Sequence, residues 1–306
     1  MSDTPILSVR NLVVEIPTRE GVLRPVDQVS YDIHAGEILG VVGESGAGKS
    51  MTGNAVIGLL DPPARITSGE VLLTGEPIHD IPRDRLRRLR GKRMGMIFQD
   101  PLTSLNPLLT VGDQLTETIQ EHLDVTQEEA RKRAVAALEE VGIPAAAQRI
   151  GSYPHEFSGG QRQRGVIALA LCAEPELVIA DEPTTALDVS VQAQIVALLK
   201  RLCRERGVAV MLVTHDMGVI AEAADRVAVM YAGRLAELGP VRDVLTEARH
   251  PYTAGLMAST PLASQGRARL RQIPGAMPRL GNLPPGCAFS PRCDYAQDRC
   301  RQDPGP

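Results

Sequence analysis

Aromatic side chains are scarce in this chain of 306 residues, where they make up 3% of the sequence, and tryptophan is absent. Aliphatic side chains must therefore fill the interior, and a hydrophobic content of 43% is sufficient for a substantial core. No run of about 18 apolar residues is present, so we expect no membrane-spanning helix. The opening "MSDTPILSVR" has neither a basic stretch nor an apolar one, and we therefore expect no secretion signal.

An excess of basic residues is also lacking, because the formal net charge is −4. This balance argues against nucleic acid as the main partner. Of five cysteines, Cys172 and Cys203 fall in stretches that are typical of helices, and we expect both to be small buried hydrophobic residues. The other three lie in "PPGCAFSPRCDYAQDRC" (284–300). Without a secretion signal, such a cluster favours metal binding over structural disulfides.

What the sequence does contain is an alternation of strand and helix patterns. The stretch "VDQVSYDI" (26–33) alternates polar and apolar residues. By contrast, "ILGVV" (38–42) is wholly apolar, and "ELVIA" (176–180) is apolar after its first residue, as buried strands are. A helical stretch at 189–206 precedes further strand patterns at 208–213 and 226–233. This order predicts an α/β fold.

Two segments depart from the alternation. Between about 101 and 157 the pattern is helical, and "TQEEARKRAVAALEEVGIP" begins with the capping-box pair Thr126 and Glu129. From Gly239 onward proline and glycine accumulate and the apolar runs become short. We therefore predict a domain over 1–238 with a helical insertion at about 101–157, followed by a loop-rich extension over 239–306 that carries the cysteines of 287–300.

The first motif with a defined chemistry is "GESGAGKS", which matches G-x-x-x-x-G-K-[ST] and lies between a buried strand and a helix. Its glycines let backbone N–H groups curl around phosphates, and the helix N-terminus adds a partial positive charge. The alternative is a glycine-rich turn with an exposed lysine. The residues expected to bind the nucleotide are Gly43, Glu44, Ser45, Gly46, Ala47, Gly48, Lys49, Ser50 and Met51, with Lys49 at the β- and γ-phosphates and Ser50 on Mg²⁺.

A second motif supplies carboxylates. In "ELVIADEP", Asp181 and Glu182 follow an apolar strand at its carboxyl end, where α/β sheets bind ligands. One carboxylate can hold the Mg²⁺ shell, while the next polarises a water for attack on the γ-phosphate. An isolated Asp-Glu pair is more often plain surface charge, but its combination with the phosphate loop favours catalysis.

The stretch "FSGGQRQR" (157–164) resembles the signature motif of ATP-binding cassette (ABC) proteins. The resemblance extends to Gln99 in "FQDP" as the Q-loop glutamine, to "TALD" (185–188) as the D-loop, and to His215 in "LVTHD" as the switch histidine. It implies an ABC-type P-loop NTPase cassette, with a RecA-like core, an antiparallel β subdomain and a helical insertion.

The same resemblance implies roles for individual residues. Catalysis would involve Glu182, His215 and Gln99. The Mg²⁺ ligands would be Ser50, Gln99 and Asp181, and Asp188 of the D-loop would join the nucleotide site.

The signature motif also has a physical rationale. Because "SGGQ" opens a helix, Ser158, Gly159, Gly160 and Gln161 present a hydroxyl and backbone N–H groups at a helix N-terminus, which is an anion-binding arrangement. In the family this site faces the γ-phosphate held by the other cassette of a head-to-tail dimer. A chain with one P-loop and one signature therefore needs a second cassette, either identical or a paralogue.

Three further stretches resemble ATPase subunits of bacterial oligopeptide and dipeptide importers. They are "FQDPLTSLNP" (98–107), "IADEPTTALDVSVQAQI" (179–195) and "RHPYTAGLMASTP" (249–261). The resemblance implies an energy-coupling ATPase on the cytoplasmic face of the inner membrane, bound to two permease subunits and indirectly to an extracytoplasmic binding protein. Nickel, glutathione or glycosides are alternative cargos. A soluble cassette that acts on chromosomes or ribosomes and an export cassette are the competing classes.

The cysteine tail resembles the "GC…PRC…C" ending of the same importers, which implies a [4Fe–4S] cluster on Cys287, Cys293 and Cys300. A fourth cysteine, normal in the family, does not follow, and zinc or free thiols are the alternatives. A second departure concerns adenine. The early strands of many relatives carry a stacking aromatic residue, whereas "VVEIPTREG" (13–21) has none and places Ile16 near that position.

Overall fold

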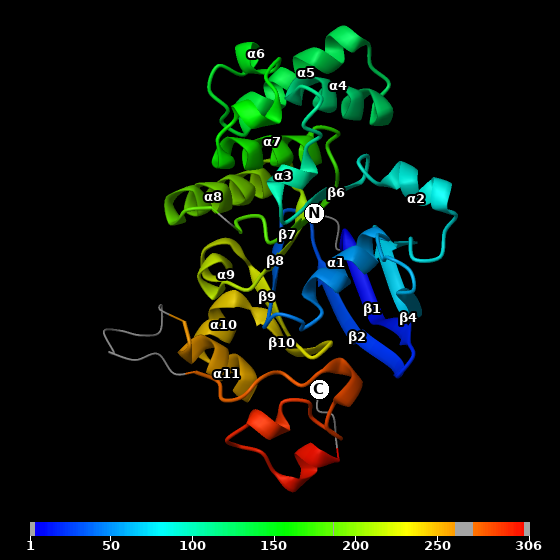
Figure 1. The fold of residues 1–306 in the computed structure, drawn as a ribbon, viewed down its shortest axis with the longest axis vertical. Coiled ribbons are helices and arrows are strands. Elements are labelled where there is room, and N and C mark those ends of the chain that lie inside the picture. Colours follow the sequence, from blue (N-terminus) through cyan, green and yellow to red (C-terminus); the bar gives the residue numbers. More distant parts are fainter. Residues whose placement is uncertain (1–3, 186, 261–271, 303–306) are drawn as a thin grey trace. The chain divides into compact units, whose positions relative to one another are not determined.

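A computed structural model describes residues 4–185, 187–260 and 272–302 (Figure 1). By its internal contacts the chain divides into two compact units. Unit 1 comprises 1–33, 38–79 and 213–306, and unit 2 comprises 34–37 and 80–212. Within the described ranges, none of the helices is both long enough and apolar enough to cross a membrane.

Unit 1 contains an antiparallel sheet with the strand order β2-β1-β4-β5. Its strands are β1 (Leu7–Thr18), β2 (Gly21–Ile33), β4 (Arg65–Leu73) and β5 (Glu76–Pro77). The predicted alternation in β2 is confirmed, because Val29, Tyr31 and Ile33 are buried while the residues between them are half-exposed. One face of this sheet therefore packs into the core.

Unit 1 also contains β3 (Ile38–Val42), which pairs in parallel with β9 (Arg226–Tyr231), and β10 (Arg234–Pro240), which pairs antiparallel to β9. All five residues of β3 are buried, as its apolar sequence predicts. Its described helices and 3₁₀ turns are α1 (Lys49–Ile57), α9 (Met217–Ala223), α10 (Val241–Thr246), α11 (Pro251–Ala258), η3 (Leu280–Asn282), η4 (Ser290–Arg292) and η5 (Asp298–Arg301).

Unit 2 has the strand order β8-β7-β6, with β6 and β7 parallel. These strands are β6 (Met94–Ile97), β7 (Leu177–Asp181) and β8 (Ala209–Thr214), and the last two residues of β8 belong to unit 1. The first four residues of β7 are buried, and Asp181 at its end is half-buried. An apolar strand thus delivers a carboxylate to its carboxyl end, as predicted.

The helices of unit 2 include the predicted insertion, drawn in cyan to green in Figure 1. They are α2 (Arg83–Leu89), α3 (Pro101–Ser104), α4 (Val111–His122), α5 (Gln127–Glu140), α6 (Ala146–Arg149), η1 (Pro154–Glu156), α7 (Gly159–Leu171) and α8 (Val189–Arg206). Thr126 caps α5 by accepting a bond from the Glu129 N–H at 3.3 Å. The Glu129 carboxylate instead accepts a bond from Arg133, so only one half of the predicted capping box is formed.

The two helical cysteines are buried, as predicted. Cys172 lies at the end of α7 and Cys203 lies within α8, and their exposed fractions are 7% and 1%. Burial raises the pKa of Cys172 to about 12, so its thiol stays protonated. The α/β fold class is confirmed, while the domain boundary at residues 238 and 239 stays a prediction.

Candidate functional site

The predicted phosphate loop leaves β3 and enters α1 in unit 1. Gly48 is the N-cap of α1, with a φ of 104°, and a Cβ at this position would clash with the carbonyl oxygen of Pro25. A Cβ at Gly43 would likewise clash with the carbonyl oxygen of Met230. Glycine is therefore required at both positions, by the close approach of neighbouring backbone and, at Gly48, also by the left-handed conformation.

Lys49 begins α1 and turns back over the loop. Its side chain donates from Nζ to the carbonyl oxygens of Gly43 at 2.9 Å and Glu44 at 3.1 Å, and the residue is only 6% exposed. No side chain caps α1, and its first turn contains no acidic residue. A buried ammonium at an uncapped helix N-terminus is an electrostatic arrangement that suits a phosphate group.

Three further predicted residues of unit 1, Ser50, Met51 and His215, lie on the first turn of α1 or directly after β8. Ser50 is exposed on the first turn of α1, and Met51 is half-buried beside it. His215 is exposed directly after β8, and the next residue, Asp216, caps α9 by accepting a bond from the Gly218 N–H at 2.7 Å. A strand end and a capped helix thus hold the histidine position between them.

Unit 2 brings two predicted catalytic residues together. Gln99 donates from Nε2 to Oε2 of Glu182 at 3.1 Å, and the Thr185 hydroxyl donates to the same oxygen at 2.9 Å. Glu182 has a φ of 45°, a conformation that is uncommon for a residue with a side chain and that is typical of functional sites. The carboxylate is therefore held in one orientation, just beyond Asp181.

The signature residues also lie in unit 2, at the start of α7. Ser158 and Gln161 form a capping box, in which Gln161 donates from its backbone N–H to the Ser158 hydroxyl at 3.3 Å and accepts from the Ser158 N–H at 3.1 Å. A Cβ at Gly160 would lie 2.7 Å from a methyl carbon of Val191, so α7 packs closely against the first turn of α8. The predicted opening of a helix by "SGGQ" is confirmed.

Asp188 of the D-loop sequence caps α8, where it accepts a bond from the Val191 N–H at 2.9 Å. Because Gly160 packs against the same valine, the signature and the end of the D-loop share one contact. Ala186, within "TALD", lies outside the described residues.

No metal site is formed by the described part of the cysteine tail. Cys287, Cys293 and Cys300 are half-buried free thiols, and among the described residues no group of three or more His, Cys, Asp or Glu side chains is placed to hold a metal ion. Their backbone is occupied in turns, with the Cys287 N–H donating to the Cys300 carbonyl at 2.8 Å. Burial raises the pKa of Cys293, so in the metal-free chain this thiol is protonated at neutral pH. The predicted [4Fe–4S] cluster therefore has no support.

The position of Ile16 follows from the strand register. In β1 it pairs with Leu23 of β2, and the tail approaches this hairpin, because a Cβ at Gly281 of η3 would lie 3.2 Å from a methyl carbon of Leu23. No aromatic side chain replaces Ile16 within the described part of β1 or in the adjoining turn.

Sequence patterns missed several residues that contact the P-loop. Arg292 of the tail forms an ion pair with Glu44, and the hydroxyl of Tyr252 accepts a bond from the Glu44 backbone N–H. No spacing rule connects residues that lie more than 200 positions apart in the chain. The one available signal was the presence of an arginine beside a cysteine in "PRC".

Comparison with known proteins agrees with this geometry. The family described as "ABC transporter" matches residues 26–185, and "Oligopeptide/dipeptide transporter, C-terminal region" matches residues 236–300. The chain is 31% identical to the solved bacterial ABC transporter cassette MJ0796, with a TM-score of 0.69, over 77% of this chain and 99% of that one. A second structure of that cassette, in a post-hydrolysis state with ADP and Pi, also has a TM-score of 0.69.

The chain therefore belongs to the ABC transporter family and is an ATPase of the cassette type. Within the family it carries the C-terminal region of the oligopeptide/dipeptide transporters. It is 49% identical to the dipeptide transport ATP-binding protein DppD of Bacillus subtilis, over 94% of this chain and 86% of that protein. The oligopeptide transport ATP-binding protein OppD of the same organism is 48% identical, over 96% and 82% of the two chains.

Proposed function

We propose that this protein hydrolyses MgATP to drive a membrane importer whose cargo is a dipeptide or an oligopeptide. The observation that carries the proposal is the presence, on one chain, of the cassette match over 26–185 and the oligopeptide/dipeptide-transporter match over 236–300. The relatives to which this chain is similar include proteins named for dipeptide and for oligopeptide transport. The cassette would occupy 1–238 and the importer-type extension 239–306.

Nucleotide binding rests on the P-loop. Lys49 neutralises charge on the β- and γ-phosphates, and the backbone N–H groups from Gly43 to Met51 hold the oxygens. Ser50, Gln99 and Asp181 would hold Mg²⁺, which compensates the phosphate charge. The uncapped start of α1 and its buried ammonium are the features that fit a triphosphate.

Hydrolysis rests on Glu182. Its carboxylate accepts a proton from the water that attacks the γ-phosphate, while Gln99 and Thr185 keep the carboxylate in place through their bonds to Oε2. His215 would contact the γ-phosphate and orient the same water.

The second half of each active site comes from a partner cassette. The signature residues Ser158 to Gln161 open α7 and present an anion site, which in a head-to-tail dimer would face the nucleotide of the other chain. Asp188 would lie at the same dimer contact. The solved cassette to which this chain is similar is described as dimeric.

The membrane subunits would dock beside the Q-loop. The stretch 98–109, which contains Gln99, carries four exposed apolar side chains, Phe98, Leu102, Leu108 and Leu109, of which Leu108 is 82% exposed. An exposed apolar group of this kind is typical of a protein interface. The protein would then sit on the cytoplasmic face of the inner membrane, bound to two permease subunits and served by an extracytoplasmic binding protein.

Reconstitution with its permease subunits and binding protein in proteoliposomes tests the function. We expect ATP hydrolysis that rises when a dipeptide or oligopeptide is supplied, and no such rise in a complex that carries Glu182→Gln. Stimulation by nickel, glutathione or a glycoside alone would replace the peptide assignment. An absence of hydrolysis with every cargo would contradict the importer assignment.

A further inference from the structure

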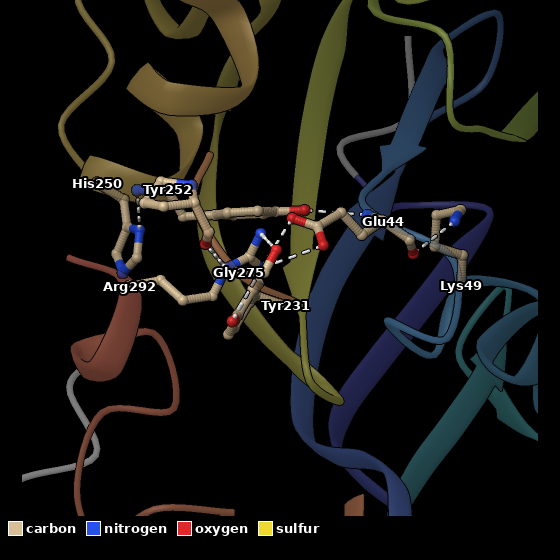
Figure 2. Close-up of polar contacts among 8 residues, drawn as sticks. Glu44, Lys49, Tyr231, His250, Tyr252, Gly275 and Arg292 are labelled. Atoms are coloured by element: carbon tan, nitrogen blue, oxygen red, sulfur yellow. Dashed lines mark hydrogen bonds and ion pairs between the residues drawn. The ribbon is translucent and has the colours of Figure 1, made fainter. Parts of the chain in front are cut away.

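A cluster of aromatic residues lies where the tail contacts the P-loop (Figure 2). The sequence has five tyrosines and three phenylalanines, and three of these eight, Tyr231, Tyr252 and Phe289, form one cluster. The ring centroids of Tyr231 and Tyr252 lie 4.6 Å apart, and Phe289 lies 5.3 Å from Tyr231, edge on. All three are nearly inaccessible to solvent. The tail is therefore anchored to β9 by a packed contact.

Arg292 projects from η4 of the tail into this cluster. Its side chain is 7% exposed and donates from Nε to the carbonyl oxygen of Pro274 at 2.8 Å and from Nη2 to that of Gly275 at 3.4 Å. From Nη1 it donates to both carboxylate oxygens of Glu44, at 3.0 and 3.1 Å, and to the Tyr231 hydroxyl at 3.3 Å. A buried guanidinium with this many partners is fixed in one position.

Glu44 is held by the tail at two points. Its carboxylate accepts from Arg292, and its backbone N–H donates to the hydroxyl of Tyr252 at 2.9 Å. Tyr252 lies in α11 and is fully buried. Both contacts act on the first residue after Gly43, at the point where the chain turns from β3 into the P-loop.

The same residue is tied to Lys49, because the Glu44 carbonyl oxygen accepts a bond from the lysine Nζ at 3.1 Å. A shift of Glu44 therefore moves an acceptor of the ammonium that would meet the phosphates. The charge of Arg292 also favours phosphate binding. Without Arg292, the Glu44 carboxylate would be an uncompensated negative charge beside a site for a polyanion, and it would repel that polyanion.

From these contacts we propose that Arg292 is a positioning residue for nucleotide binding, through which the C-terminal extension sets the affinity of the P-loop for MgATP. Arg292 acts through Glu44 and does not itself touch the nucleotide. The proposal rests on the nucleotide-binding function of the P-loop, which the unmodified protein tests separately.

The test is a double-mutant cycle on the full-length chain, with MgATP affinity measured by titration calorimetry. We expect Arg292→Gln to weaken MgATP binding about tenfold. The same change in a Glu44→Gln background should weaken it by less than twofold, because no carboxylate is then left unpaired. In the assembled transporter, Arg292→Gln should raise KM for ATP while kcat changes by less than twofold. Arg299→Gln, an exposed arginine on the same tail, is the matched control and should leave affinity unchanged.

Two results would overturn the proposal. One is an unchanged MgATP affinity in Arg292→Gln. The other is an equal loss of affinity in the unmodified and the Glu44→Gln backgrounds, which would mean that Arg292 acts on the P-loop through contacts other than Glu44. If the unmodified protein fails to bind MgATP, the nucleotide assignment itself is wrong. If Arg292→Gln does not fold, amide hydrogen exchange on the unmodified protein tests the proposal instead. Coupling between the P-loop and the tail is reciprocal, so a ligand at the P-loop must stabilise the tail contact. MgATP should then slow exchange at residues 289–293, and exchange that stays the same would refute the proposed coupling.

Discussion

Helices α1 and α7 both begin with a glycine-rich stretch, yet their first turns are built differently. Helix α1 starts at Gly48 in a left-handed conformation, with no side-chain cap and with Lys49 turned over the loop. Helix α7 starts at Ser158, where the serine and Gln161 satisfy each other in a capping box. The start of α1 therefore has no side-chain cap, whereas the start of α7 has a complete capping box.

This difference indicates that the two helix starts have different roles in nucleotide binding and turnover. At α1 a bound phosphate would supply the negative charge that a capping side chain otherwise supplies, and we expect binding there to contribute affinity. At α7 the cap already satisfies the Gln161 N–H, and a phosphate can gain chiefly the Ser158 hydroxyl and the N–H groups of Gly159 and Gly160. We expect the P-loop to determine affinity and the signature to determine the closed dimer and turnover.

The largest effect should come from Glu182→Gln, which lowers turnover without touching either helix start. Loss of a general base costs roughly 100- to 10,000-fold in rate, while MgATP binding at the P-loop should persist and trap the closed dimer. Steady-state ATPase assays of the assembled transporter and nucleotide-binding titrations measure both parts. Wild-type turnover in this variant would remove Glu182 from its role, and Glu128→Gln, an exposed glutamate of α5, is the control.

Lys49→Ala should come next, because it removes the ammonium from the uncapped start of α1. Charge-assisted hydrogen bonds to phosphate are strong, and we expect MgATP affinity to fall about 100-fold. Calorimetry on the full chain measures the change. The control is Lys132→Ala, at an exposed position of α5, which should leave MgATP affinity unaltered. Retained affinity would contradict the assignment of affinity to α1.

Ser158→Ala should distinguish the role of the α7 start from that of the α1 start. Removal of a capping hydroxyl costs about 1 kcal/mol in the free energy of unfolding, and turnover in the assembled transporter should fall at least about tenfold. MgATP affinity of the isolated chain should change by less than twofold. Thr126→Ala removes the cap of α5 in the same unit and should reproduce the stability loss alone. A large loss of affinity in Ser158→Ala would break the proposed division.

The smallest effect concerns a third helix start. His250 caps α11, accepting at Nδ1 a bond from the Tyr252 N–H at 3.1 Å, and therefore must be neutral there. Burial lowers the pKa of His250 below its ordinary 6.5, although the Glu237 carboxylate opposes this shift. The unfolded chain therefore takes up the proton more readily, and the contribution of this cap to stability is lost as pH falls below about 6.5.

Urea unfolding at pH 7.5 and 5.5 measures this contribution, which we expect to be below about 1 kcal/mol. His250→Asn keeps an acceptor that does not titrate and should show a smaller difference between the two pH values. An equal pH dependence in both proteins would mean that other groups account for it.

Much of the site could be predicted because its motifs are local. Glycines that permit a close backbone approach, a lysine at a helix start and a carboxylate after an apolar strand all act within a few residues of one another. The expected helix at 189–206 coincides with α8, and the strand patterns at 208–213 and 226–233 differ from β8 and β9 by one and by two residues at their ends. The cluster on Cys287, Cys293 and Cys300 was expected from resemblance alone, and no arrangement of the described side chains supports it.

The sequence by itself therefore determined the α/β class, the P-loop, the Asp181–Glu182 pair and the helix start at the signature. Only the tertiary structure decided that Gln99 meets Glu182 across 83 residues and that Arg292 meets Glu44 across 248. Periodicity and motif spacing describe what neighbouring residues do to one another. Contacts of this range depend on how strands and turns bring distant segments together, which no local pattern in the sequence encodes.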